Sequence, residues 1–145
     1  IVAWGGGLNP FAPNRVVMLS EKQFHYAFTN LIDDPAEAKA IYDRLPVPGP
    51  AKALIQAGTA NFNPRAVTKI DFKKERAPLL LLAGGKDHTV PASVTRSNYK
   101  LQSKGPNVTE LKEYPDRSHF TASQQGWEEV ADHAITWAQR AAGGS

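Results

Sequence analysis

Residues 77–91 read APLLLLAGGKDHTVP, and this stretch decides the fold. Its apolar run, residues 78–83, ends at two glycines and is typical of a strand covered on both faces, as in a parallel sheet, although leucine is a weak strand former. Helical spacing follows over residues 92–103, and residues 108–114 alternate apolar and polar side chains as a half-buried or edge strand does. The sequence therefore predicts a strand, a helix and a second strand, and with them the α/β fold class.

A last helix is predicted over residues 125–141. One of its faces carries the apolar side chains Trp127, Val130, Ala131, Ala134, Trp137 and Ala138. We expect that face to pack on the sheet. Two parallel strands do not form a stable core, because each strand needs neighbours for its hydrogen bonds and cover on both faces. We therefore expect the sheet to continue in strands of a partner chain or of a longer polypeptide, and the loop-like start at Ile1 favours the longer polypeptide.

The first half of the chain predicts loop and short helices. Residues 1–19 are rich in Gly and Pro and show no periodicity, which is typical of a loop. A capping box at Ser20 begins a helix over residues 21–32. Asp34, an N-cap in front of a proline, begins a second helix, and Pro50 opens a third. We expect these helices to form one small helical segment.

Composition excludes several classes of protein. The chain has 145 residues, the length of one domain, and a net charge of +3 from interleaved acids and bases, so we expect no nucleic-acid partner. No apolar run approaches the ~20 residues of a membrane helix and no signal peptide is recognisable, so we expect no membrane span and a cytoplasmic location. The chain has no cysteine, which excludes disulfides and thiol nucleophiles. Histidines and carboxylates do not recur at ligand spacing, so we expect no metal and no cofactor.

Two polar loops follow the two predicted strands. Because the carboxyl ends of parallel strands meet at one edge of a sheet, Asp87 in the first loop and His119 in the second are expected to face one another. A carboxylate beside an imidazole is an acid–base pair that serves nucleophilic hydrolases. The structural alternatives are that Asp87 caps a turn and that His119 is an ordinary structural histidine. His88, next to the proposed acid, is interpreted as a loop residue.

The same segments resemble the α/β-hydrolase family. Residues 77–91 are similar to that family's penultimate strand and acid loop, residues 116–120 to its histidine loop, and residues 126–130 to its final helix. The resemblance implies Asp87 as the acid and His119 as the base of a catalytic triad. The nearest likeness is to bacterial esterase- or lysophospholipase-like hydrolases, which implies a carboxylic ester or a related acyl compound as the small-molecule substrate.

The chain departs from the family pattern at the nucleophile. The family places its serine in a Gly-x-Ser-x-Gly elbow between a strand and a helix, upstream of the acid, and no such motif occurs here. Ser20 is a helix cap, Ser93 follows the acid loop and Ser118 adjoins the histidine. The resemblance therefore implies that the serine, the oxyanion-hole loop and the N-terminal half of the core lie outside these 145 residues, on a separate chain or segment. Alone, this chain is expected to hydrolyse nothing.

The resemblance also implies a division of the chain into three regions. Residues 1–75 form a loop and a helical cap or lid, residues 76–142 form the C-terminal part of the hydrolase core, and residues 143–145 are a linker-like tail. Phe24 and Phe28 share the apolar face of the first predicted helix. That face is either the buried side of the cap or the wall of an acyl pocket, and we assign both residues as candidate substrate-binding residues.

Two further interpretations remain open. The chain could be a non-catalytic module derived from a hydrolase, in which exposed strand edges bind a partner chain. Alternatively, the same histidine loop could serve dehalogenase-like chemistry with an aspartate nucleophile, or cofactor-free peroxidase chemistry. The identity of the nucleophile would separate these alternatives.

Overall fold

The computed structural model describes residues 15–63 and 70–143. Three stretches lie outside that description: residues 1–14 of the expected loop, residues 64–69 of the expected cap and residues 144–145 of the expected tail. The chain divides into two compact units. The helical unit comprises Ile1–Tyr26 and Asp33–Asp71, and the sheet unit comprises Ala27–Ile32 and Phe72–Ser145. The sequence analysis placed residues 27–32 in the cap, whereas the structure counts them with the sheet.

The sheet unit contains the strand, helix and strand that the sequence predicts. β3 (Leu79–Gly84) leads into α4 (Ala92–Gln102), β4 (Thr109–Tyr114) and α5 (Trp127–Gly143). β3 and β4 pair in parallel, with Leu79 opposite Thr109 and Gly84 opposite Tyr114. The described part of the chain therefore mixes helices with parallel strands joined through a helix, as an α/β class requires. α5 extends to Gly143, which the sequence analysis assigned to the tail.

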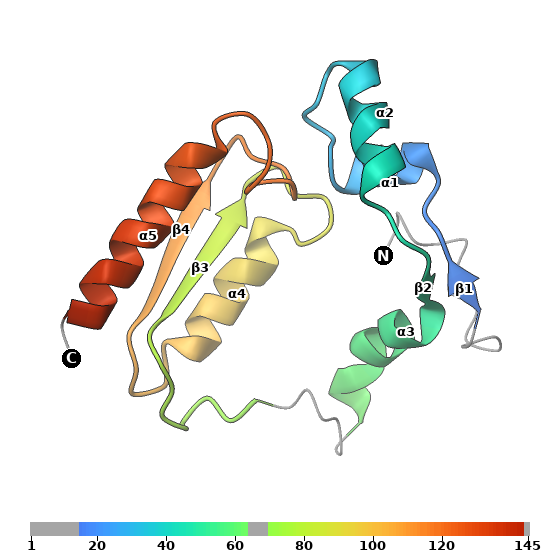
Figure 1. Cartoon of the computed structure of the whole chain (residues 1–145). Helices are drawn as coiled ribbons and strands as arrows, with labels where there is room; N and C mark the ends of the chain where they lie inside the picture. The colour runs from blue at the N-terminus through green and yellow to red at the C-terminus, as the bar shows by residue number, and fades with distance from the viewer. Residues whose placement is uncertain (1–14, 64–69, 144–145) are drawn as a thin grey trace. The chain divides into compact units, whose positions relative to one another are not determined.

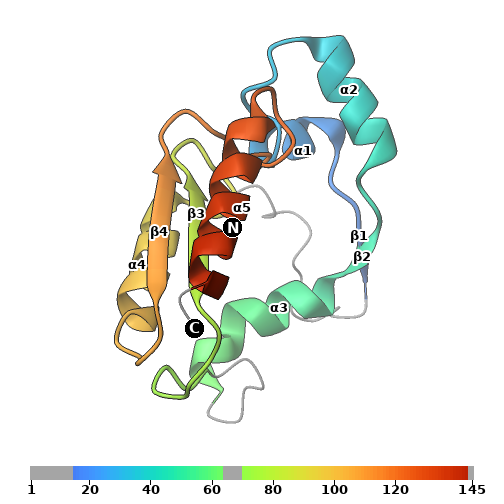
Figure 2. The ribbon, with the colours of Figure 1, turned by 60° about the vertical axis from the view of Figure 1, so that its left-hand side comes forward.

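α4 and α5 cover opposite faces of this sheet (Figures 1 and 2). Glu113 of β4 accepts two hydrogen bonds of 2.8 Å from Arg96 of α4. Glu110, whose side chain points to the other face, pairs with Arg140 of α5 at 2.9 Å. Because successive side chains of a strand alternate between faces, this alternation assigns one helix to each face.

β3 and the apolar face of α5 are less buried than the sequence predicts. Leu79, Leu80, Leu81 and Leu82 are half-buried, and burial is complete only at Ala83 and Gly84. In α5 the buried residue is Val130, whereas Trp127 is 47% exposed. The reason is the width of the sheet: with one neighbouring strand, β3 keeps an open edge, and two strands give a helix little surface to pack on.

The helical unit begins with the caps that the sequence predicts. At the start of α1 (Glu21–Ala27), the Gln23 side chain accepts a hydrogen bond from the Ser20 backbone N–H at 3.0 Å. At α2 (Pro35–Arg44), Asp34 accepts one from the Ala36 N–H at 2.9 Å. α3 (Ala51–Thr59) and a 3-10 turn, η2 (Ala60–Phe62), complete the described helices of this unit.

A short antiparallel pair between β1 (Val16–Val17) and β2 (Gly49–Pro50) was not anticipated. The sequence analysis assigned residues 16 and 17 to loop, because two residues are too few to show a strand period. Elsewhere in this unit Phe24 is 7% exposed, and its ring meets that of Tyr42 edge-on at 5.7 Å. The apolar face of α1 thus contributes to the core of the helical unit at this position.

α1 ends five residues earlier than predicted. The carbonyl of Ala27, which would accept an N–H in a continuing helix, accepts the Thr89 hydroxyl at 2.6 Å. The Ile32 N–H then bonds to the Thr29 carbonyl in a tighter turn, and Thr29 is fully buried. Tertiary contacts therefore override the helical period of residues 28–32.

Gly84, the last residue of β3, allows the two loops beyond the sheet to approach each other. A Cβ at this position would lie 2.6 Å from the carbonyl oxygen of Arg117 and 2.7 Å from that of Ser118. Both neighbours are backbone atoms, which do not swing aside as a flexible side chain would. The absence of a side chain at Gly84 is thus a condition for the loop contact.

Replacing Gly84 with Ala is expected to lower the free energy of unfolding by about 1–3 kcal/mol, the usual cost of overpacking. Urea denaturation followed by circular dichroism measures it. Gly143→Ala is the matched control, since a Cβ there meets nothing within 4 Å, and its effect should stay within about 0.5 kcal/mol. Equal stability of Gly84→Ala and the wild type would contradict the close approach of the loops.

Candidate functional site

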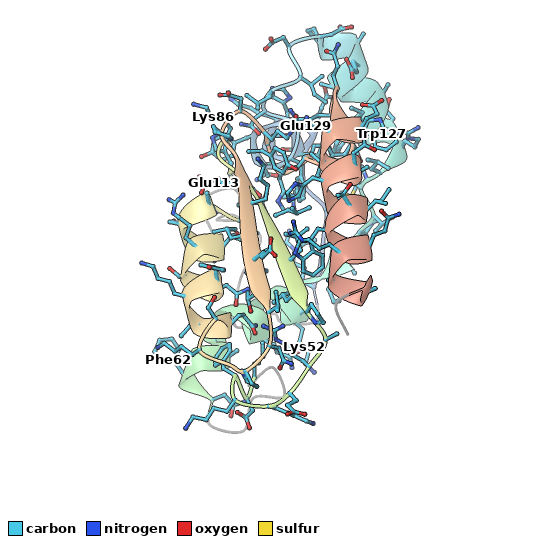
Figure 3. The ribbon with its side chains drawn as sticks, turned by 90° about the vertical axis from the view of Figure 1, so that its left-hand side faces the viewer. Lys52, Phe62, Lys86, Glu113, Trp127 and Glu129 are labelled. Carbon is cyan, nitrogen blue, oxygen red and sulfur yellow. The ribbon has the colours of Figure 1, made fainter. Side chains whose placement is uncertain are left out.

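Two loops meet where β3 and β4 end. The acid loop, residues 85–91, follows β3, and the histidine loop, residues 115–126, follows β4. The Gly85 N–H donates to the Tyr114 carbonyl at 2.8 Å, and the Lys86 N–H donates to the Arg117 carbonyl at 2.9 Å. Figure 3 shows Lys86 and Glu129, near the start of α5, at the same end of the sheet. The strand ladder thus continues as hydrogen bonds between the loops.

Asp87 and His119 face each other across this junction. The Nδ1 atom of His119 lies 2.8 Å from the Oδ2 atom of Asp87. A carboxylate accepts hydrogen bonds and does not donate them, so Nδ1 carries a proton, and in the neutral imidazole Nε2 then has the lone pair. The Asp87 side chain is 9% exposed and the His119 side chain is 32% exposed. The carboxylate is therefore sheltered while the imidazole reaches solvent.

The second oxygen of Asp87 holds the acid loop itself. Oδ1 accepts hydrogen bonds from the backbone N–H groups of Thr89 and Val90, each at 2.7 Å. This is the turn-capping role that the sequence analysis set against a catalytic one. The turn does not occupy the whole carboxylate, because the other oxygen, Oδ2, is the one that contacts His119.

Phe28 approaches the imidazole from the segment 27–32. Its ring lies edge-on to His119, with 5.0 Å between centroids and 71° between planes. Within residues 15–63 and 70–143, no hydrogen bond engages the Nε2 atom of His119. The ring is thus held at Nδ1 and along one side, and its second nitrogen is left for another group.

The segment 27–32 is tied to the acid loop by two polar contacts. The Asn30 side chain donates to the Lys86 carbonyl at 3.1 Å, and the Thr89 hydroxyl donates to the Ala27 carbonyl at 2.6 Å. The sequence analysis did not identify Asn30 or Thr89, because neither residue belongs to a motif and the partners are distant along the chain. A helix predicted through residue 32 also hid the turn that brings them close.

Ser118 and Gln124 brace the histidine loop. The Gln124 side-chain oxygen accepts hydrogen bonds from the Ser118 N–H and the Ser118 hydroxyl, both at 2.9 Å. The same hydroxyl accepts the Phe120 N–H at 3.1 Å. Ser118 is 1% exposed. Its hydroxyl is thus used by the loop, which agrees with its exclusion as a nucleophile.

Arg117 is the buried cation of this loop and was also missed. It is 9% exposed and donates to the carbonyls of Thr121 and Gly126. It further pairs with Glu129 of α5, with 3.4 Å between Nη2 and Oε2. An isolated arginine in a loop gives no signal of burial in the sequence.

Phe24 and His88, which were also singled out from the sequence, are not part of the contact between Asp87 and His119. Phe24 belongs to the helical unit, where it packs on Tyr42. His88 is exposed in the acid loop, and the His133 ring lies edge-on to Tyr114 at 6.5 Å. Among the described residues, no group of three or more His, Asp or Glu side chains could hold a metal ion. Over the same residues, no helix combines the length and apolarity needed to cross a membrane.

Tyr114, at the end of β4, has a phenol whose pKa is shifted from its usual value. Burial raises the pKa of its phenol above 10.0, the Glu129 carboxylate raises this pKa further, and the Arg117 guanidinium opposes them. Its hydroxyl is buried and has no hydrogen-bond partner among the described residues. Tyr114 therefore contributes packing and cation–π contacts rather than a hydrogen bond, with the Arg117 guanidinium 5.5 Å from its ring.

We expect the His119 Nδ1 proton to give a slowly exchanging resonance downfield of the amides in ¹H NMR, and ¹⁵N shifts to identify Nε2 as the lone-pair nitrogen. Asp87→Asn should remove that resonance and shift the imidazole toward the other tautomer, because an amide N–H₂ donates to Nδ1. Asp116→Asn, which alters an exposed carboxylate of the histidine loop, should leave the spectrum unchanged. An unaltered tautomer in Asp87→Asn would contradict the pair.

Tyr114→Phe is expected to preserve stability at neutral pH or raise it by up to about 1 kcal/mol, because it removes a buried hydroxyl without a partner. The raised pKa in the folded state means that the unfolded state loses its proton first as pH rises. The free energy that the protonated phenol of Tyr114 contributes to folding is therefore fully present below about pH 10 and is lost above it. Tyr114→Phe, which has no phenol to ionise, should lose less stability than the wild type at alkaline pH. Urea unfolding at several pH values measures this, and a loss above about 1 kcal/mol at neutral pH would reveal a hydrogen bond of the hydroxyl.

Comparison with known proteins leaves this geometry to be interpreted on its own. No family model matches the chain, and no curated protein matches it either. The functional conclusion therefore rests on the residues of the sheet unit.

Proposed function

We propose that the chain supplies the acid and the base of a serine-type α/β hydrolase that acts on a carboxylic ester or a related acyl compound. Asp87 is the acid and His119 the base. The observation that carries this proposal is the 2.8 Å contact between Asp87 Oδ2 and His119 Nδ1 at the ends of two parallel strands. Ligands of open α/β sheets bind at that edge.

The proposed chemistry follows from the state of the imidazole. Nε2, left with its lone pair, takes the proton of a serine hydroxyl as the serine oxygen attacks the acyl carbonyl. The Asp87 carboxylate stabilises the imidazolium that forms and keeps the ring in one tautomer. The imidazolium then gives its proton to the leaving alcohol, and a water activated in the same way releases the acid from the acyl-enzyme. No cofactor is needed.

The serine in this proposal comes from outside these 145 residues, on another segment or chain. Of the serines in the histidine loop, Ser118 is buried and its hydroxyl is engaged by Gln124. Phe28, beside the imidazole, supplies an apolar surface next to the reacting nitrogen and is the better candidate for acyl contact. Phe24 is already packed on Tyr42.

The open edge of β3 favours a second candidate, a non-catalytic association module. The Leu79 N–H bonds to the Val108 carbonyl just before β4, and the Gly85 N–H bonds to the Tyr114 carbonyl at its end. The backbone groups of Leu80, Leu82 and Gly84 therefore point to the opposite edge. No described strand pairs with that edge. Such an edge accepts a strand of a partner by main-chain hydrogen bonds.

Labelling with a fluorescent fluorophosphonate separates the two candidates. The material to label is the native polypeptide or complex that contains this sequence, with substitutions introduced in its gene. The wild type should be labelled on a serine outside residues 1–145, which peptide mass spectrometry locates. Asp87→Asn and His119→Ala should slow both labelling and ester hydrolysis by about 10³-fold or more.

His88→Ala is the matched control for this experiment, because His88 is an exposed histidine of the same acid loop and should leave both rates unchanged. Folded wild-type material that neither reacts with the probe nor hydrolyses p-nitrophenyl esters would refute the hydrolase proposal and favour the association module.

A further inference from the structure

Arg117 stands two residues before the proposed base and joins the histidine loop to its surroundings. Its Nη1 donates to the Thr121 carbonyl at 3.3 Å, and its Nη2 donates to the Gly126 carbonyl. Thr121 and Gly126 lie after His119 in the chain. The guanidinium therefore joins the part of the loop before His119 to the part that follows it.

The same residue connects the loop to three neighbouring elements. Its backbone carbonyl accepts the Lys86 N–H of the acid loop at 2.9 Å. Its side chain lies over the ring of Tyr114, the last residue of β4, and pairs with Glu129 in the first turn of α5. Arg117 thus links the acid loop, β4, the histidine loop and α5 through one side chain and one carbonyl.

Arginine suits this position better than lysine. The planar guanidinium has five N–H donors in a fixed fork, so it serves two carbonyls and a carboxylate at once, and its flat face stacks on an aromatic ring. A lysine ammonium would be a single point charge at the end of a flexible stem. A guanidinium that is 9% exposed also needs these partners to offset its lost hydration.

The local backbone around the last acceptor supports the same arrangement. Gly126 has a φ of +75°, a conformation that side chains disfavour, and it turns its carbonyl toward the guanidinium. A Cβ at Gly126 would lie 3.3 Å from Arg117 Nη2. The loop therefore returns to α5 through a glycine that leaves room for the arginine.

We propose that Arg117 is the positioning residue of the site, which holds the histidine loop so that the His119 Nδ1–H stays on the Asp87 carboxylate. The inference rests on the proposed function, since the position of His119 has a consequence only where that imidazole acts on a substrate. No hydrogen bond joins the Arg117 and His119 side chains among the described residues, so Arg117 acts through the loop.

The test measures the water-exchange rate of the His119 Nδ1 proton by NMR in the native polypeptide or complex that contains this sequence. Arg117→Lys and Arg117→Met should raise the rate about tenfold or more, as expected when hydrogen bonds to a charged group are lost. Arg140→Met is the matched control. It removes an arginine–carboxylate pair between α5 and β4 that involves no residue of the histidine loop, so the rate should not change.

Glu129→Gln keeps the experiment decisive if the Arg117 variants do not fold. The Glu129 side chain is 67% exposed, so the variant should fold, and a weakened ion pair should raise the exchange rate about twofold to fivefold. A merely structural arginine would lower stability in urea yet leave the exchange rate of the folded variants unchanged, and that result overturns the inference. A wild-type chain without the Nδ1 resonance overturns the proposed function and this inference together.

Discussion

The parallel ladder between β3 and β4 determines where the candidate functional residues lie. Its register places Gly84 opposite Tyr114, so both strands end at the same level and both loops start there. The ladder then continues beyond the strands, because the Gly85 and Lys86 N–H groups bond to the carbonyls of Tyr114 and Arg117. A shift by one residue would turn alternate side chains to the other face of the sheet and separate the loops. The contact between Asp87 and His119 therefore depends first on the register of the two strands, which brings their loops together, and then on the chemistry of the two side chains.

Structural and chemical roles coincide in the two loops. Asp87 uses one oxygen for the backbone of its own turn and the other for His119, so its turn fixes the direction of the carboxylate. Ser118 differs from Asp87, because its hydroxyl and its N–H both bond to Gln124 of the same loop. In the proposed reaction, preorganisation of this kind lowers the reorganisation needed when charge develops on the imidazole. It also explains how a half-exposed histidine keeps a defined orientation.

Sequence reasoning located the elements and the pair but not the residues that hold the pair in place. The apolar run before two glycines, the alternation over residues 108–114 and the caps at Ser20 and Asp34 are local signals, and the structure contains each of them. Asn30 and Thr89 bond to carbonyls that are 56 and 62 residues away along the chain, and Arg117 bonds to carbonyls within an irregular loop. Such contacts leave no periodic signal in the sequence. The end of α1 at Ala27 was missed for the same reason, because a distant hydroxyl takes the carbonyl that the helix would use. Burial was overestimated in β3, since residue type predicts apolarity and not the number of neighbouring strands.

The open edge of β3 has a consequence for the handling of the chain. Leu79–Leu82 is an uncharged segment of β-structure without proline, and its backbone groups on one side have no described partner strand. Natural sheets protect such edges with charges, bulges or covering elements, and β3 carries none of these charges within its six residues. Such an edge allows two copies of the chain to pair through the backbone of β3. Among the described strands β3 is therefore a point at which copies are expected to associate at high concentration, and a charged side chain on this strand would oppose that association.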